Sequence, residues 1–350
     1  MNNVTPEAPE LRKDPVTGRW VIIARERAKR PQQISGISLV KHSHSNDFCP
    51  FCPGHENETP PEVLSYRSPN TQKDSEGWWV RVVPNKYPAL ISSTPCKKSA
   101  HGIYDRMNGY GVHEVLIESP HHCHTFAELP TTQIQEILWA MRDRTVELRK
   151  LPNIKYVLIF KNWGSEAGAS IEHPHSQIIG LPVVPMRVMD ELSGASKYFE
   201  FKERCVFCDI IQQELSDKTR IVAENDSFLA YMPFASRFPY ESCIIPKEHT
   251  SYYVDVTKNQ VNDLSTIIKD LFSLYKQSLG NIPYNFMFHT APLSKSETNN
   301  YYHWHIEVIP KLSTVAGFEW GSGFHINVVA PEDAAKHLCE AKDAKTALDD

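Results

Sequence analysis

The sequence contains no apolar run that approaches the roughly 18 residues of a membrane-spanning helix. Its first residues, MNNVTPEAPELRKDPV, have neither the apolar h-region of a secretory signal nor the Arg- and Ser-rich amphipathic character of an organelle-targeting segment. We therefore expect a cytoplasmic protein that has no membrane partner.

An excess of positive charge is also missing. Lys and Arg number 37 against 42 Asp and Glu, the formal net charge is −5, and no long Lys/Arg run occurs. This balance argues against a protein that grips the backbone of a nucleic acid, so an anionic substrate must be bound by local groups. Only eight residues are cysteines. In a long chain without a secretory signal, paired cysteines are expected to be metal ligands or free thiols rather than disulfides.

The same two features recur in the same order in both halves of the sequence. A Cys-x-x-Cys pair comes first, and a His-x-His pair comes last, with a histidine, a helix and a strand between them. The interval from His122 to His173 is 51 residues, and the interval from His249 to His303 is 54 residues. A repeated segment of this kind predicts internal duplication, with two domains of similar size in the 350 residues.

Hydrophobic spacing predicts the elements of each repeat. Apolar residues at helical spacing indicate one helix from about Ile134 to Leu148, after the cap candidates Thr131 and Thr132, and another from Val261 to Tyr275. The predicted strands are 19–24, 156–160 and 285–288, and a solvated helix is expected from Pro331. We predict an α+β fold of two tandem domains, each an antiparallel sheet with a long helix, over residues 1–182 and 183–350, with the boundary in the turn-rich segment 180–185.

Each repeat offers four side chains that suit a tetrahedral zinc ion. A single Cys-x-x-Cys pair is equally compatible with a redox pair or buried thiols, but two pairs with matching histidines favour metal. The predicted ligands are Cys49, Cys52, His122 and His173 in the first half, and Cys205, Cys208, His249 and His303 in the second. His121 and His124 compete with His122 on spacing alone. Four protein ligands leave no open position, so a structural role is expected for both ions.

His173 and His175 are two residues apart, so on a strand their side chains leave the same face. One can be held by metal while the other faces substrate, and a neutral imidazole is a competent nucleophile at phosphorus. Gln177, Ser170 and backbone amides near Gly168 are candidate donors to phosphate oxygens. The alternative is that both histidines are ligands or core residues. In the second half Ile306 and Glu307 replace Ser and Gln, so that half is predicted to be catalytically silent.

With these motifs assembled, the chain resembles the galactose-1-phosphate uridylyltransferases, a branch of the histidine triad superfamily. The resemblance covers almost the whole length and rests on His-Pro-His-Ser-Gln at 173–177 together with the segments 14–18, 27–31, 85–90 and 317–321 and with Asn162. It implies a ping-pong reaction in which His175 takes UMP from UDP-glucose and passes it to galactose 1-phosphate. It further implies a homodimer and a substrate site that contains Arg27, Arg30, Phe51, Asn85, Val115, Asn162, Ser170, Gln177, Phe318 and Glu319, the last two contacting the sugar across the dimer interface.

Three departures from some relatives bear on the substrate and the metal. Lys86 stands where some relatives have Asp, and Cys205 and Cys208 indicate zinc where some relatives have a Glu/His iron site. A closely similar branch with the paired cysteines acts as an ADP-glucose phosphorylase, and Pro174 favours the uridylyltransferases over it.

Two functions of a different kind compete with nucleotidyl transfer. One is an inert zinc-stabilised nucleotide-binding protein, and the second is a hydrolase of dinucleoside polyphosphates. An intact His-Pro-His-Ser-Gln in the first half and its altered counterpart at 303–307 argue against the inert protein, because a scaffold does not require that asymmetry. Most relatives that act as such hydrolases have a single domain, whereas this sequence carries the repeat twice, which argues against a hydrolase.

Overall fold

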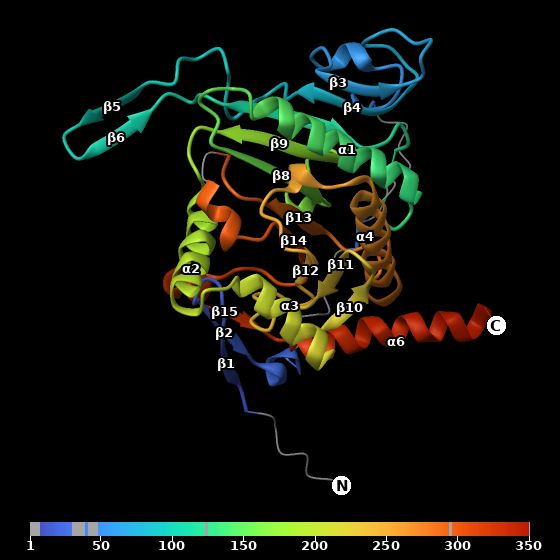
Figure 1. The fold of residues 1–350 in the computed structure, drawn as a ribbon. Coiled ribbons are helices and arrows are strands. Elements are labelled where there is room, and N and C mark those ends of the chain that lie inside the picture. Colours follow the sequence, from blue (N-terminus) through green and yellow to red (C-terminus); the bar gives the residue numbers. More distant parts are fainter. Residues whose placement is uncertain (1–7, 30–38, 41–47, 123–124, 294–295, 350) are drawn as a thin grey trace.

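The computed structural model describes residues 8–29, 39–40, 48–122, 125–293 and 296–349 (Figure 1). Ten strands form one antiparallel sheet at the centre of the molecule. In spatial order they are β10 (Ile221–Glu224), β11 (Phe228–Tyr231), β12 (Ser242–Pro246), β14 (His305–Pro310), β13 (Tyr284–His289), β8 (Tyr156–Trp163), β9 (His175–Leu181), β7 (Val112–Ile117), β4 (Trp78–Pro84) and β3 (Leu64–Arg67).

This sheet consists of two five-stranded halves with the same topology. Counted outward from the centre, the first half runs β8-β9-β7-β4-β3 and the second runs β13-β14-β12-β11-β10. The halves meet where β8 pairs antiparallel with β13, from Trp163 opposite Tyr284 to Phe160 opposite Met287. The predicted α+β class with a duplicated antiparallel sheet is therefore confirmed, and the two sheets join edge to edge into one.

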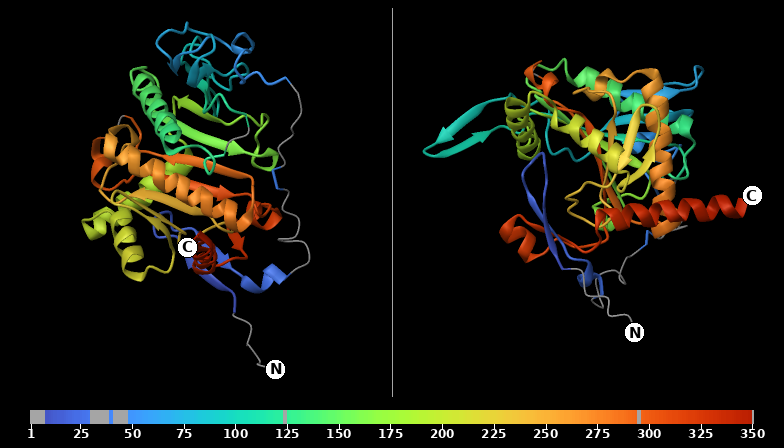
Figure 2. Two further views of the ribbon diagram at one scale, coloured as in Figure 1. Left: turned by 90° about the vertical axis from the view of Figure 1, so that its right-hand side faces the viewer. Right: turned by 60° about the horizontal axis from the view of Figure 1, so that its bottom comes forward.

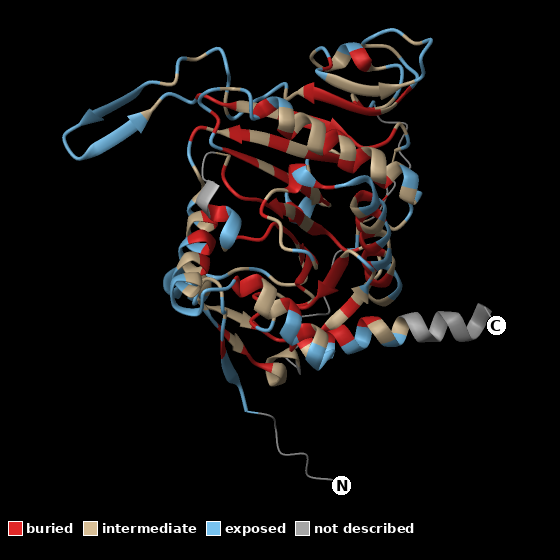
Figure 3. Cartoon of the chain, in the orientation of Figure 1, coloured by how far each residue is buried: buried red, intermediate tan, exposed pale blue. Residues whose placement is uncertain are grey.

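Helices cover both faces of the second half of the sheet. Alternate side chains of a strand point to opposite faces and therefore enter different cores. Phe228 and Ala230 belong to the core beneath α1 (Thr131–Leu148) and α4 (Lys258–Leu279). Leu229 and Tyr231, from the same strand, pack with α2 (Met186–Lys202) and α3 (Val206–Asp217) instead. β11 and β12 are accordingly buried at every residue, and buried residues recur along the central strands (Figure 3).

The two long helices form where helical spacing predicts them. Thr257 precedes α4 and accepts a hydrogen bond from the Gln260 amide in a capping box, and Gly280 ends the helix with φ of +80°. The prediction for the start of α1 is wrong, because Pro130 is the N-cap and Thr131 is already helical. Proline has no side-chain oxygen that could accept from the amides of the first turn, so the helix begins without a side-chain cap.

The N-terminal segment packs against the second half of the chain. β1 (Glu10–Lys13) and β2 (Trp20–Ile23) form a small sheet with β15 (His325–Asn327), and β2 pairs with β15 in parallel. Figures 1 and 2 place this sheet at the end of the molecule opposite β3, β4 and β9. The predicted strand 19–24 is thus β2. Its apolar side chains Val21 and Ile23 pack with Ala235 and Ala330.

The remaining elements are short or peripheral. A hairpin of β5 (Lys98–His101) and β6 (Tyr104–Met107) projects from the body, and α6 (Pro331–Asp349) is the predicted C-terminal helix (Figure 1). Among the described residues, no helix is long and apolar enough to cross a bilayer. The other short helices are η1 (Arg25–Lys29), η2 (Glu56–Glu58), η3 (Ser165–Ala167), η4 (Tyr253–Asp255), η5 (Ser296–Asn300) and α5 (Gly317–Ser322).

Candidate active site and metal centres

The four predicted ligands of the first half meet beside the start of β9. Their ligand atoms all lie within 4.8 Å of one another, in a set made of Cys49, Cys52, His122 and His173. Cys52 Sγ lies 3.4 Å from Nδ1 of His122 and 3.5 Å from Nδ1 of His173. Two thiols and two imidazoles at these separations are the donor set that tetrahedral zinc takes in structural sites. The competitor His121 is outside this set, and His124 lies outside the described residues.

His173 is oriented by a hydrogen bond on its outer nitrogen. Nε2 donates to the Ser119 carbonyl oxygen at 2.7 Å, so Nδ1 is left without a proton and faces the thiols. Burial lowers the pKa of His173 to about 4. The imidazole is therefore neutral at pH 7, which is the form that binds a metal ion.

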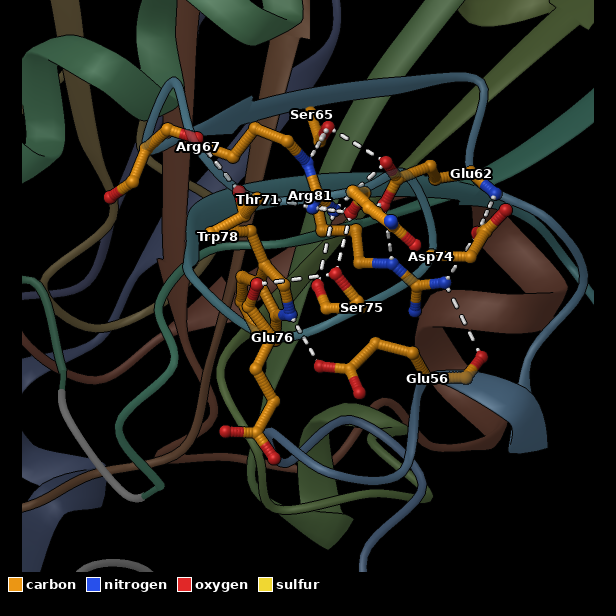
Figure 4. Close-up of polar contacts among 12 residues, drawn as sticks. Glu56, Glu62, Ser65, Arg67, Thr71, Asp74, Ser75, Glu76, Trp78 and Arg81 are labelled. Carbon is orange, nitrogen blue, oxygen red and sulfur yellow. Dashed lines mark hydrogen bonds and ion pairs between the residues drawn. The ribbon is translucent and has the colours of Figure 1, made fainter.

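A buried polar network holds the turn that carries the two cysteines. Glu56 accepts hydrogen bonds from the Gly54 amide at 3.1 Å and from the Trp78 indole at 2.7 Å. Next to it, the buried Arg81 forms ion pairs with Glu62 at 2.9 Å and with Asp74 at 3.0 Å (Figure 4). Arg81 is paired with two carboxylates, and the Glu56 carboxylate is hydrogen-bonded, so the network can fix this turn on β4.

His175 is the first residue of β9 and is only 7% exposed. Its Nδ1 donates to the His173 carbonyl oxygen at 2.8 Å, so Nε2 carries the free lone pair. Burial lowers the pKa of His175, which favours the neutral nucleophilic form at pH 7. The ring of Phe51 packs edge-on with its centroid 5.4 Å from that of His175. The structure therefore gives the two histidines of the motif different surroundings.

Gln177 is fixed by His113, a residue that the sequence analysis missed. The Ala89 amide donates to Nδ1 of His113 at 3.1 Å, so the ring proton is on Nε2 and is donated to Oε1 of Gln177 at 2.7 Å. The amide nitrogen of Gln177 is then left to donate to another group. Asn85 lies beside the same ring, with Nδ2 3.1 Å from Nε2 of His113, and Val115 pairs with Gln177 in the sheet.

The loop between β8 and β9 carries the other predicted phosphate donors. Asn162 Oδ1 accepts a hydrogen bond from Asn285 at 2.8 Å, and Asn285 also donates to the Ala167 carbonyl at 2.9 Å. Gly168 follows η3 with φ of +91°, a left-handed conformation that side chains rarely adopt. This turn leads into Ser170, which is exposed. Two residues lie between Ser170 and His173, where the buried His-Pro-His segment begins.

The remaining predicted substrate residues are not brought to His175 within one chain. Arg27 lies in η1 directly after β2, and Phe318 and Glu319 lie in α5 directly before β15. These segments flank the small three-stranded sheet, which lies apart from β9 at the other side of the second half of the chain (Figures 1 and 2). Phe318 is 47% exposed. Arg30 lies outside the described residues.

The second Cys/His set also converges. The ligand atoms of Cys205, Cys208, His249 and His303 lie within 4.8 Å of one another, with Cys208 Sγ 3.3 Å from Nδ1 of His249. The hydrogen bond from the Cys205 thiol lowers the pKa of Cys208, and His249 and His303 add to this effect, so the thiolate is favoured. His249 Nε2 donates to the Asn299 carbonyl oxygen at 2.7 Å, as the outer nitrogen of a metal ligand does.

A third cluster next to the second set was not expected from the sequence. Nδ1 of His289 lies 3.1 Å from Glu191, and its Nε2 lies 3.4 Å from Glu307. Burial opposes protonation, but the two carboxylates outweigh it and raise the pKa of His289 to about 9. Arg187 and Arg237 pair with Glu307 at 2.7 and 3.0 Å. The acidic groups are thus balanced by cations of the chain, in an ion-pair network that joins α2, β13 and β14.

Comparison with known proteins places this geometry in a family. The profile of the galactose-1-phosphate uridyl transferase N-terminal domain matches residues 3–185, and that of the C-terminal domain matches residues 191–343. The chain belongs to the galactose-1-phosphate uridylyltransferase family. The sequence resemblance is therefore confirmed.

Individual relatives divide between two activities. An ADP-glucose phosphorylase of Arabidopsis thaliana is 38% identical over 97% of this chain and 95% of its own length. A galactose-1-phosphate uridylyltransferase of Thermotoga maritima is 31% identical over 95% of this chain and 98% of its own length. The crystal structure of the Arabidopsis thaliana ADP-glucose phosphorylase with bound ADP-glucose superposes with a TM-score of 0.79 at 36% identity, covering 95% of this chain and 98% of that one.

Proposed function

We propose that the chain is a nucleotidyltransferase that acts on a nucleoside diphosphate hexose through a covalent nucleotidyl-His175 intermediate. The observation that carries this proposal is the orientation of the His175 ring. Its Nδ1–H is engaged by the His173 carbonyl at 2.8 Å, so the lone pair of Nε2 is the one that can attack. The free amide of Gln177, two residues along the same strand face, can donate to a phosphate oxygen as negative charge develops there.

The reaction has two displacements at the α-phosphorus. In the first, Nε2 of His175 forms a bond to phosphorus, and the phosphorus–oxygen bond to the hexose 1-phosphate breaks. In the second, an oxygen of the acceptor phosphate bonds to the same phosphorus, and the bond to His175 breaks. One difficult exchange is thereby divided into two easier steps, and the histidine is regenerated.

The donor and acceptor follow from two different lines of support. The sequence motif with Pro174 and the Thermotoga maritima relative favour UDP-glucose as donor and galactose 1-phosphate as acceptor. ADP-glucose and inorganic phosphate are the second candidate pair, because the identity to the Arabidopsis thaliana ADP-glucose phosphorylase is 38% against 31%. The nucleophile and the metal centres are the same for both pairs.

We propose that each Cys/His cluster binds one zinc ion, giving two ions per chain. Both sets contain two thiols and two imidazoles, which fill the four positions of a tetrahedral ion and leave none for substrate. Bound zinc would supply rigidity: the first centre cross-links the cysteine turn to the start of the strand that carries His175. In this proposal the metal has no chemical step of its own.

We further propose that the working unit is a homodimer in the cytoplasm. The segments η1, with Arg27, and α5, with Phe318 and Glu319, flank the small three-stranded sheet, which lies apart from β9 and its His175 (Figures 1 and 2). A second copy can present these residues to His175 in a symmetric pair, and each copy would then complete the site of the other. The exposed Phe318 is available for such a contact.

Intact-mass spectrometry tests the proposed function. The purified protein is incubated separately with UDP-glucose and with ADP-glucose, without acceptor, and the expected product is a UMP or AMP adduct that His175→Gly does not form. Discharge of a UMP adduct by galactose 1-phosphate supports the first pair, and discharge of an AMP adduct by phosphate supports the second. Absence of any adduct on the zinc-loaded protein, with both donors, contradicts the proposal and favours an inert nucleotide-binding protein.

A further inference from the structure

Three polar side chains are buried directly behind the nucleophile, on the face of the sheet that α1 and α4 cover. Glu118 and Ser176 are 0% exposed and Lys161 is 1% exposed. Lys161 Nζ lies 2.5 Å from Oε2 of Glu118, and Ser176 Oγ donates to Oε1 of Glu118 at 2.5 Å. Ser176 follows His175 in β9, so the two side chains leave opposite faces of the strand. The network therefore does not touch the substrate face.

Glu118 and Ser119 form hydrogen bonds with the chain on both sides of His175. The backbone amide of Glu118 donates to the Pro174 carbonyl at 3.1 Å, and its carboxylate accepts from Ser176. Ser119 accepts the hydrogen bond from His173. Residues 173, 174 and 176 are thus all held by residues 118 and 119, and Lys161 fixes the carboxylate from the neighbouring strand β8. His175 lies between the residues that these bonds hold, and we call this set of bonds the clamp.

The second half of the chain shows what the same fold uses where no nucleophile is needed. Ile306 is the counterpart of Ser176, because each follows the second histidine of its His-x-His pair. Phe288 is the counterpart of Lys161, because it pairs with Ile306 as Lys161 lies beside Ser176. Counting from the pairs Ile117–His175 and Ile244–Ile306, the position of Glu118 corresponds to Pro246. All three counterparts are apolar and buried, and Pro246 has no N–H to donate.

The fold does not require the three polar residues. The second half builds the same five-stranded sheet and an equivalent Cys/His cluster without a buried charge at these positions. Burying an ion pair has a large desolvation cost, so a purely structural role is served at least as well by apolar side chains. The charged set occurs only in the half that carries the predicted nucleophile.

We propose that Glu118 is a positioning residue for His175, and that Lys161 holds its carboxylate in place as the acceptor for Ser176. The inference rests on the proposed nucleotidyl transfer. By holding the backbone from Pro174 to Ser176, the clamp keeps Nε2 of His175 in line with the phosphorus–oxygen bond that breaks. Misplacement of a reacting group by about 1 Å lowers a rate by roughly 100-fold.

Two double variants test the inference without leaving a buried charge unpaired. Glu118→Leu/Lys161→Met removes the carboxylate and its bonds to Ser176 and Lys161, while the backbone bonds of Glu118 and Ser119 remain. The new side chains are apolar and of similar volume, as in the second half, so folding and zinc content are expected to persist. Glu118→Gln/Lys161→Met also removes both charges but retains an acceptor for Ser176. The matched control is Glu114→Leu/Arg144→Met, which removes a largely buried pair (2.6 Å) whose carboxylate lies in β7, four residues before Glu118.

The measured quantity is the single-turnover rate of adduct formation at saturating donor, together with the donor concentration that gives half of that rate. The Leu/Met variant is expected to form the adduct about 100-fold more slowly with little change in the half-saturating concentration. The Gln/Met variant is expected to be at least tenfold faster than the Leu/Met variant, and the Glu114/Arg144 control to match the wild type.

The outcomes distinguish this inference from the proposed function. If the wild type forms no adduct with either donor, nucleotidyl transfer itself is wrong, and the positioning role falls with it. If the wild type forms the adduct and the folded, zinc-loaded Leu/Met variant forms it equally fast, the transfer stands and the positioning role is overturned. Equal slowing in the Glu114/Arg144 control would show that any lost ion pair on β7 disturbs the site, which also overturns it.

Discussion

The two histidines of the His-Pro-His segment are two residues apart but have different partners. His173 faces the Cys49 and Cys52 thiols, whereas His175 has a free Nε2 on the opposite side of a hydrogen-bonded ring. We expect His175→Gly to abolish the covalent adduct while zinc content and melting temperature stay near the wild-type values. His173→Ala is expected to lose the first zinc ion and to lower the melting temperature. Metal analysis and calorimetry of both variants check this, and identical behaviour of the two would contradict it.

His113 is the residue whose role only the three-dimensional structure reveals. It orients Gln177 by donating to Oε1 at 2.7 Å, and the rest of the amide is thereby aimed at substrate. A hydrogen bond of this kind contributes about 1 kcal/mol, so His113→Leu is expected to lower kcat by roughly fivefold with a smaller effect on KM. The matched control is His101→Leu, in the exposed hairpin. Steady-state kinetics, with the donor that mass spectrometry identifies, measures this effect. An unchanged kcat would refute the orienting role of His113.

At the scale of elements, α2, β13 and β14 meet at His289. The carboxylates of Glu191 and Glu307 raise the pKa of His289 to about 9 in the folded chain, against about 6.5 when unfolded. A raised folded-state pKa stabilises the fold fully below pH 6.5, and this contribution is lost as the pH rises through 9. We expect the free energy of unfolding of the zinc-loaded protein to fall by up to roughly 3 kcal/mol between pH 6.5 and 9.5.

Urea unfolding across this pH range measures the effect, and His289→Gln is the comparison variant. The variant is expected to be less stable at pH 6.5 but to lack most of the decline toward pH 9.5, because the titrating imidazole is gone. A decline of the same size in His289→Gln would assign it to other groups.

Elements with a strong local pattern were predictable from the sequence, and elements fixed by distant contacts were not. The apolar spacing from Val261 to Tyr275 gives α4 because one face of it is buried on the sheet. No prediction covered α2 and α3, although Cys205 is the N-cap of α3 and Cys208 lies in its first turn. The first pair, Cys49 and Cys52, lies in a turn instead, so a Cys-x-x-Cys motif does not by itself specify the local structure.

In the candidate site, too, local motifs were predictable and contacts between distant residues were not. Residues within a short motif, such as those of His-Pro-His-Ser-Gln, could be assigned because strand geometry relates neighbours directly. The pair of Glu118 and Lys161 is separated by 43 residues, and the network of His289 with Glu191 spans 98, so strand order had to be known first. A charged residue in a sequence gives no sign of whether it is buried and paired or merely solvated.

At the scale of the whole molecule, η1 with Arg27 and α5 with Phe318 lie apart from β9, the strand of His175, and this placement predicts a site shared between two copies. Gel filtration is expected to give a dimer. Heterodimers that combine a His175→Gly chain with an Arg27→Ala/Phe318→Ala chain, isolated with two different tags, should contain one intact site of two and show about half of the wild-type rate. Each parent homodimer should be nearly inactive. If the site were built within one chain, the heterodimer would also be inactive, because the chain that retains His175 would lack its own Arg27 and Phe318.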